Sequence, residues 1–471
     1  MSNKQNRRNF LKGSFVSSSA GLVAGAVGGT SAQAQTDQQK VGEAPSILSM
    51  DRTRVELFEY MKTLPVIDAH THIRPEAWRL RWPMSALTLF GTHPALDAKS
   101  SAGVSGNFDP PFSQPYTYLN DGSIPLRERW NAIKPYLANA RFGSFYRGTK
   151  IALRDIYDVD DITDDNVEEV TERIQAENKP GIYQKILRER SNIQTCLVQC
   201  SGPQFDELAP LPLLTRIYSG PTTYKHNISA FVKQIGDLYG TQIEDLDTFL
   251  EILGKFLKER KEKDGAAGFK IYTWGDWMYV DPDLEESGKD FKKTLAEGVP
   301  TTPVLEATIK DHVFKLCAEW DWPVSAHGGG NYMDFRKFDT RKLIDIIMRH
   351  PETRFDLFHL GIPFPLDFIF IAKSFPNITL NLVWAQALSE WVTRDCINQI
   401  LDAVPINKVI AFGSDAREHI EIAYGYLTMM RELMAEALSE RIARGRLNME
   451  DAKYIAKIWF YDNPAEIYRL S

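Results

Sequence analysis

The chain has 471 residues and a formal net charge of −7, with 43% hydrophobic and 25% charged residues. This is an ordinary globular balance, and the length allows one large domain with insertions or two domains. No basic run or patch indicates nucleic-acid binding, so we exclude that class of partner. No apolar run after the N-terminus approaches the roughly 20 residues that a membrane span needs.

The first 34 residues have the pattern of an export signal. Arg7 and Arg8 precede a weakly hydrophobic stretch, and the small residues of "SAQAQ" suggest cleavage after Ala34. The segment resembles a twin-arginine signal peptide, and a disordered basic tail is the alternative. The resemblance implies that the twin-arginine machinery exports residues 35–471 to the periplasm as a folded domain, with a metal loaded before export.

Short apolar runs alternate with amphipathic stretches from Pro65 onward, which is typical of β/α units around a parallel sheet. We expect strands at eight places: 66–70, 193–199, 213–219, 268–274, 323–327, 354–361, 378–384 and 408–415. Apolar residues at helical spacing predict helices over 243–265 and 304–321. This order favours an α/β fold of the (β/α)8 TIM-barrel type. A doubly wound open sheet is the alternative, but the first strand lacks a glycine-rich phosphate fingerprint.

A long insertion, at about 73–190, separates the first two predicted strands. It is far longer than a barrel loop needs. Its first part is rich in proline and aromatic residues, and its second part is helical. Because it follows the C-terminal end of the first strand, we expect it to cover the active-site face as a lid.

The four cysteines do not have the spacing of a disulfide framework. Cys196 and Cys200 lie in one predicted strand. Their Cα atoms would be about 13 Å apart there, which is too far for a bridge. Cys317 and Cys396 lie in helical sequence.

Two histidines end the first predicted strand. In "DAHTH", His70 and His72 are separated by one residue. On a strand they point the same way, with Cα atoms about 6.6 Å apart. This arrangement suits two imidazoles on one metal ion, and two polar loop residues are the alternative. Their position favours the metal site, because barrel active sites form at strand C-termini.

Three more polar residues follow predicted strands: His327, His359 and Asp415. A single histidine at such a position is usually structural. The three residues after an H-x-H motif, in this order, indicate a shared site. Histidine and aspartate are suitable ligands for zinc and similar ions.

Five motifs carry a resemblance to the amidohydrolase superfamily: "VIDAHTH", "PVSAHGG", "FHLGIP", "AFGSD" and "DNPAEIYRL". The nearest branch holds metal-dependent hydrolases, decarboxylases and uronate isomerase. The resemblance implies a distorted (β/α)8 barrel that binds one or two divalent ions, zinc first among them. It implies that His70, His72 and His327 are metal ligands. It also implies that His359 is a ligand or a catalytic residue, and that Asp415 is both ligand and proton shuttle.

Lys270 lies within the fourth predicted strand, and its role stays open. By the resemblance it could be a carboxylated lysine that bridges two metals. Substrate contact and an outward-facing or carboxylate-paired lysine are the alternatives. An unpaired buried lysine would be costly, so an inward-facing one needs a function.

Arg74 and Arg417 follow the H-x-H motif and Asp415, and either could bind a substrate carboxylate through two hydrogen bonds. Trp274 could line the pocket. Surface exposure and packing are the alternatives for these three residues. The remaining histidines lack a strand-end position, and we interpret them as structural: His93, His226, His312, His350 and His419.

The main hypothesis is a metal-dependent hydrolase of a small, carboxylate-bearing molecule. Metal-activated water would cleave an amide, lactone or ester bond, and Asp415 would accept the proton. A non-oxidative decarboxylase or an isomerase like uronate isomerase could use the same site, because fold and metal do not fix the reaction. A periplasmic binding protein on an inactive scaffold is a third reading, which the complete residue set disfavours. The sequence leaves the substrate, the metal count and homo-oligomer formation open.

Overall fold

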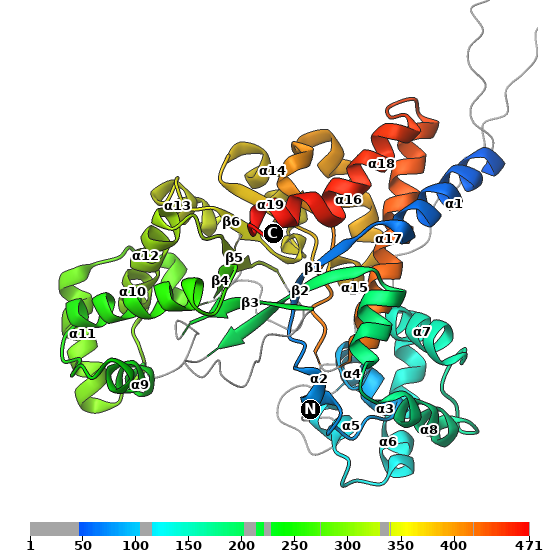
Figure 1. Cartoon of the computed structure of the whole chain (residues 1–471), viewed down its shortest axis with the longest axis horizontal. Helices are drawn as coiled ribbons and strands as arrows, with labels where there is room; N and C mark the ends of the chain where they lie inside the picture. Colours follow the sequence, from blue (N-terminus) through cyan, green and yellow to red (C-terminus); the bar gives the residue numbers. More distant parts are fainter. Residues whose placement is uncertain are drawn as a thin grey trace, which may run out of the picture. The chain divides into compact units, whose positions relative to one another are not determined.

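The structure, a computed structural model, describes residues 47–103, 115–201, 213–220, 228–273, 275–329, 339, 341–417 and 419–470. These residues contain one sheet of eight parallel strands, which follow one another in the order β1 to β8 (Figure 1). The strands are β1 (Val66–Thr71), β2 (Ile193–Ser201), β3 (Leu214–Ser219), β4 (Gly268–Tyr272), β5 (Val324–His327), β6 (Phe355–Leu357), β7 (Ile378–Asn381) and β8 (Val409–Ile410).

Hydrogen bonds join the first strand to the segment after the last one. The Ala69 amide donates to the Phe412 carbonyl at 3.1 Å, and the Asp415 amide donates to the His70 carbonyl at 2.9 Å. Gly413 lies in this seam, where a Cβ would lie 2.4 Å from the side chain of Val383. The sheet therefore closes almost completely, and the predicted (β/α)8 barrel is confirmed.

Three predicted strands end three or more residues earlier than expected, at β6, β7 and β8. We expected strands over 354–361 and 408–415, but β6 ends at Leu357 and β8 ends at Ile410. Beyond these ends His359 and Asp415 have φ values of 63° and 52°. This left-handed conformation cannot continue a strand, and it is uncommon for residues other than glycine.

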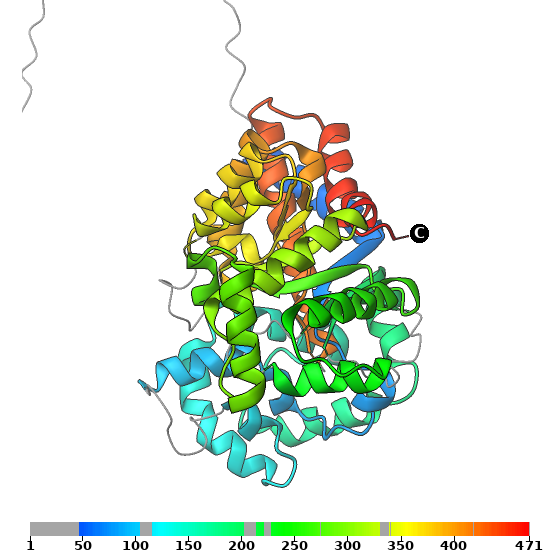
Figure 2. The ribbon, with the colours of Figure 1, turned by 90° about the vertical axis from the view of Figure 1, so that its left-hand side faces the viewer.

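Helices pack around the barrel, and the chain after β8 is also helical (Figure 2). The predicted helices over 243–265 and 304–321 are confirmed as α10 and α12. Asp245 begins α10 by accepting a hydrogen bond from the Thr248 amide at 2.8 Å, a typical N-cap. Outside the insertion the helices of five or more residues are α1 (Ile47–Thr63), α9 (Ser229–Tyr239), α10 (Leu246–Glu262), α11 (Leu284–Glu297), α12 (Pro303–Glu319), α13 (Lys342–Arg349), α14 (Pro365–Ser374), α16 (Glu390–Ala403), α17 (Ile420–Ala443), α18 (Met449–Lys457), η6 (Ile458–Asp462) and α19 (Asn463–Ile467). The shorter ones are η2 (Asp276–Tyr279), η4 (His359–Gly361), α15 (Ala385–Leu388) and η5 (Ile406–Lys408).

The predicted helical insertion lies between β1 and β2. Its elements are α2 (Glu76–Arg79), α3 (Ala86–Phe90), α4 (His93–Ser101), α5 (Pro115–Asn120), α6 (Leu126–Ala140), α7 (Ser144–Tyr157), α8 (Val167–Glu177) and the π-helix η1 (Gln184–Arg190). It has a hydrophobic cluster of its own, built from residues between Met84 and Ile174. Helix α7 packs against α17, which follows β8. The insertion therefore follows β1 directly and also packs against a helix that follows β8, the two strands between which the barrel closes.

All four cysteines are buried and unpaired, as their spacing predicted. Among the described residues, no helix combines the length and the apolar character required to span a membrane.

Candidate metal centre and active site

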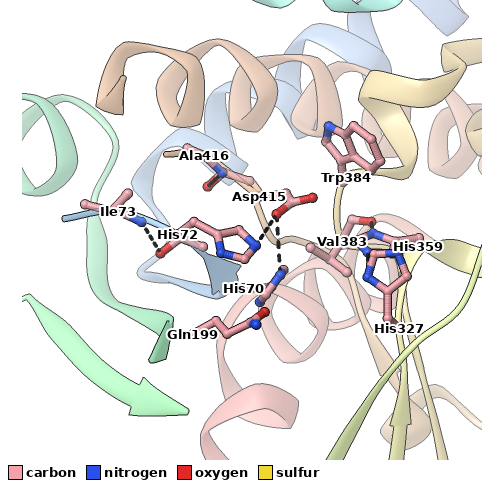
Figure 3. Close-up of polar contacts among 12 residues, drawn as sticks. His70, His72, Ile73, Gln199, His327, His359, Val383, Trp384, Asp415 and Ala416 are labelled. Carbon is pink, nitrogen blue, oxygen red and sulfur yellow. Dashed lines mark hydrogen bonds and ion pairs between the residues drawn. The ribbon is translucent and has the colours of Figure 1, made fainter. Parts of the chain in front are cut away.

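Three predicted ligands come together at the barrel seam. The Nε2 atoms of His70 and His72 lie 3.4 and 3.2 Å from Oδ1 of Asp415 (Figure 3). One ligand atom from each residue lies within 4.8 Å of the other two. An ion bound at about 2.0–2.2 Å brings its nitrogen and oxygen ligands within about 3–4 Å of one another. The spacing therefore fits a divalent metal.

Backbone contacts fix this cluster. All six residues of β1 are buried. Within β1, Asp68 accepts hydrogen bonds from the Ser414 amide at 2.8 Å and from the His70 amide at 3.4 Å. The His72 amide donates to the Ala416 carbonyl at 2.7 Å. The two ligand segments are thus joined before any metal binds.

The protonation of the cluster also suits a metal. Burial lowers the pKa of His70 well below its usual value. Burial raises the pKa of the Asp415 carboxyl, but hydrogen bonds from His70 and His72 outweigh it and hold that pKa well below its usual value. Metal ligands must be neutral imidazoles and ionised carboxylates, and this set supplies both.

The other two predicted histidines form a separate pair. Nε2 of His359 lies 3.2 Å from Nδ1 of His327, and Nδ1 of His359 lies 3.1 Å from the Val383 carbonyl oxygen. A carbonyl only accepts, so the His359 Nδ1–H donates to it, and Nε2 of His359 accepts from the His327 Nδ1–H. This leaves Nε2 of His327 without a proton, as a metal ligand or a base requires.

Burial keeps this pair neutral. It lowers the pKa of His359 to about 4 and that of His327 well below its usual value. The His70 and His359 rings are 6.3 Å apart between centroids, so the pair lies beside the cluster.

Lys270 faces the barrel interior and is 1% exposed, so an outward-facing lysine is excluded. Its Nζ lies 3.7 Å from the centroid of the Phe358 ring and has no hydrogen-bond partner among the described residues. Burial lowers its pKa to about 7, against the opposing charges of Asp415 and Asp356. Bridging of two metals and substrate contact both stay open.

The predicted carboxylate-binding residues lie on the loops that leave β1 and β8. Arg74 and Arg417 are exposed. The Arg74 guanidinium lies 5.3 Å from the centroid of the Trp78 ring. Trp274, the predicted pocket residue, lies outside the described residues.

His93 is a site residue that the sequence interpretation missed. The Trp384 indole Nε1–H donates to Nδ1 of His93 at 3.2 Å, and the Tyr426 hydroxyl lies 3.2 Å from the same atom. An indole only donates, so the proton of His93 is on Nε2. Burial lowers the pKa of His93 to about 4, and the charges of Asp415 and Arg417 also act on it. His93 is therefore neutral, with its proton on Nε2.

The sequence signal nearest to His93 is its partner Trp384, the last residue of the predicted strand over 378–384. In the structure Trp384 has a φ of 61°. A left-handed conformation is unusual for a bulky residue and is typical of functional sites. The Trp384 and His359 rings are 5.5 Å apart, so Trp384 connects His93 to the histidine pair.

A cavity of about 510 Å³ lies at the opposite ends of the strands. It is lined by residues at strand starts, including Ile67, Thr195 and Thr215. None of the predicted site residues lines it, so it is separate from the candidate centre.

Known proteins give the arrangement a context. Residues 257–470 match the family model described as "Amidohydrolase". The uronate isomerase of Thermotoga neapolitana is 22% identical over 470 residues, covering 89% of this chain and 98% of that protein. The uronate isomerase of Bacillus licheniformis is 24% identical over 304 residues, covering 60% of each chain.

Two solved structures share the fold. The uronate isomerase of Thermotoga maritima has a TM-score of 0.71 and 17% identity, covering 88% of this chain and 97% of that one. The glucuronate isomerase of Caulobacter crescentus has a TM-score of 0.70 and 15% identity, covering 91% and 96%.

The hydrolase prediction is wrong. The curated relatives that match over almost their full length are uronate isomerases, which agrees with the alternative kept for the same site. The error has a physical origin, since two histidines and an aspartate at strand ends specify a metal site and not the reaction at it. The resemblance itself is confirmed, because residues 257–470 match the amidohydrolase family model, and members of that superfamily usually bind a divalent metal.

Proposed function

We propose that this enzyme is an aldose–ketose isomerase that acts on a uronate, a sugar acid with a carboxylate at the end opposite its carbonyl. The near-full-length likeness to the uronate isomerase of Thermotoga neapolitana carries the proposal. The site supports it, because every group that such a reaction needs has a candidate among the residues around the cluster.

Isomerisation of an aldose to a ketose moves one hydrogen from C2 to C1 and one proton from the C2 hydroxyl to the C1 oxygen. No water is consumed. The reaction needs a base for the C2 hydrogen and donors for the oxygens. A divalent ion held by His70, His72 and Asp415 would polarise the carbonyl.

The residues have distinct roles in this proposal. Asp415 takes the hydrogen from C2 through Oδ2 and returns it to C1. The His327–His359 pair carries the proton between the two substrate oxygens. The Nε2–H of His93 donates to a substrate oxygen, and Arg74 and Arg417 bind the carboxylate.

The direct test incubates the metal-loaded enzyme with glucuronate and other hexuronates in D2O and follows the products by NMR. We expect the keto-uronate to form, with deuterium entering the carbon-bound positions next to the carbonyl. Glucose, which lacks the carboxylate, is the matched substrate control and should react far more slowly. Neither ketose formation nor deuterium incorporation from any hexuronate would refute the proposal.

We further propose zinc as the metal, because histidine and aspartate ligands at this spacing suit it. Elemental analysis of the purified protein tests this choice and gives the number of ions per chain. Another divalent metal at stoichiometric amount would overturn it.

We also propose that residues 1–34 direct export to the periplasm. The Arg7→Lys and Arg8→Lys double variant should keep a fused reporter in the cytoplasm, whereas the unmodified segment should export it. Equal export of both fusions would contradict a twin-arginine route.

A further inference from the structure

A buried ion pair joins α2 and α17, the first helices after the two segments that carry His70, His72 and Asp415. Nη2 and Nη1 of Arg79 donate to Oε1 and Oε2 of Glu421 at 2.7 and 3.1 Å. Both side chains are fully buried. The Tyr157 hydroxyl donates to Glu421 at 2.6 Å, and Nε of Arg79 donates to Asn178 at 3.1 Å. The pair is therefore bidentate and further supported by two helices of the insertion.

Its place in the chain relates it to the site. Arg79 is in α2, a few residues after His72, and Glu421 is in the first turn of α17, a few residues after Asp415. The pair thus connects the loop that carries Arg74 to the loop that carries Arg417.

The β1–α2 loop is also held at its other end. The Tyr183 hydroxyl donates to the Arg74 carbonyl at 2.7 Å. The carboxylate of Glu76 accepts from the amides of Gly181 and Tyr183 at 3.1 and 2.9 Å. These contacts fix the backbone of Arg74. The positions that its guanidinium group can occupy therefore depend on where the loop is anchored.

A buried ion pair is a poor source of stability, since desolvation of both charges offsets their attraction. Replacement of such a pair by apolar residues of similar volume is often neutral or stabilising in proteins. What the pair does provide is a fixed geometry, because the guanidinium fork and the carboxylate meet in one planar arrangement. Burial raises the pKa of Glu421, but the charge of Arg79 outweighs it, so the carboxylate stays ionised.

We propose that Arg79 and Glu421 are positioning residues that set the spacing of Arg74 and Arg417 for a substrate carboxylate. Preference for carboxylate-bearing ligands then depends on a pair that does not touch the ligand. This inference rests on the proposed function, since it concerns how the same site selects uronates.

The test compares two ligands that differ only in the carboxylate: a six-carbon aldonate and the matching alditol. Their dissociation constants are measured by isothermal titration with the metal-loaded enzyme. The test variant is Arg79→Met with Glu421→Leu, which removes both charges and leaves neither one unpaired. We expect the preference of the wild type for the aldonate to fall at least tenfold, with alditol binding and metal per chain unchanged.

A second buried ion pair supplies the matched control. Lys310 and Glu306 form an ion pair within α12, and Lys310 is fully buried. The Lys310→Met and Glu306→Gln double variant should leave the aldonate preference unchanged. If the first double variant does not fold, Arg79→Lys keeps the charge and loses the fork, and it should lose part of the preference.

The outcomes separate the two proposals. The positioning role would be overturned if the wild type showed no preference for the aldonate. It would also be overturned if the folded Arg79→Met and Glu421→Leu double variant kept the preference of the wild type. If the wild type prefers the aldonate but isomerises no uronate, the proposed function is overturned. The positioning role is then decided by whether the double variant loses the preference for the aldonate.

Discussion

The two histidine pairs of the site lie at similar strand ends and have different surroundings. At the β1–β8 seam, His70 and His72 share the carboxylate of Asp415. At β5 and β6, His327 and His359 bond to each other, and His359 also donates to a backbone carbonyl. The first pair is joined by a negative charge, whereas the second pair has only neutral partners.

The difference indicates how one residue type takes two roles within a single site. A carboxylate next to two neutral imidazoles neutralises part of a cation's charge, so the seam is the better metal site. The second pair keeps the proton pattern of a relay: both nitrogens of His359 and Nδ1 of His327 are hydrogen-bonded, and the relay would reach the substrate through Nε2 of His327. We therefore expect replacement of His70 or His72 to affect both metal content and turnover, and changes at the second pair to affect turnover alone.

The largest effect should come from Asp415→Asn. Asparagine keeps the shape of the side chain and removes the base, so turnover should fall by about 10²–10⁴-fold or more. Most of the metal should stay bound, because His70 and His72 are unchanged. Elemental analysis and steady-state kinetics check this, and unchanged turnover would show that another residue moves the hydrogen.

The second expected effect is at His359. Replacement by Asn removes a relay nitrogen, and kcat should fall by about 10²-fold or more with the metal content unchanged. His350→Asn is the control, because His350 is also buried but does not lie at a strand end. Its Nε2 atom lies 2.9 Å from Oδ1 of Asp311. This variant should lower the thermal midpoint without changing kcat. Loss of metal from the His359 variant would break the comparison and make both pairs one metal site.

A smaller effect is expected at His93, which contacts the second pair through Trp384. Phenylalanine keeps the stacking on Phe145 and Trp384 and removes the N–H donor. The KM for the uronate should rise about tenfold, which corresponds to about 1.4 kcal/mol, or one hydrogen bond. Tyr426→Phe removes only a partner of Nδ1 and should change KM less. Equal effects of the two variants would show that His93 is structural.

The sequence was sufficient for the barrel and for the residues at its strand ends. Apolar runs with turns between them reveal parallel strands, and a polar residue directly after such a run is easily found. The left-handed turns at His359 and Asp415 leave no such trace, so the strands were predicted too long. His93 is in the insertion, and only tertiary packing brings it to Trp384.

The reaction was beyond the reach of the sequence motifs. Histidines and an aspartate at the ends of β1, β5, β6 and β8 are compatible with hydrolysis, decarboxylation and isomerisation alike. Similarity along the whole chain, including the insertion that brings His93 and Arg79 to the barrel, was needed to favour isomerisation.

Lys270 lies near both pairs and offers the mildest test of the comparison. Its charge is among the groups that lower the pKa of His70, His327 and His359. The pKa of Lys270 is about 7 in the folded chain, against 10.5 for an ordinary lysine. Between these pH values the unfolded chain binds more protons, so the folded chain should gain stability as the pH rises from 7 toward 10.5.

Lys270→Met removes this dependence while keeping most of the side-chain volume. The variant should be more stable than the wild type by a few kcal/mol below pH 7, and the gain should vanish toward pH 10.5. Thermal or urea unfolding of the metal-free proteins across this range measures it. Parallel profiles would mean that Lys270 keeps its charge in the fold, so that a fixed cation separates the two pairs. A fall from two metal ions per chain to one in the loaded variant would instead assign Lys270 to a bridge between them, and the two histidine pairs would then be halves of one binuclear site.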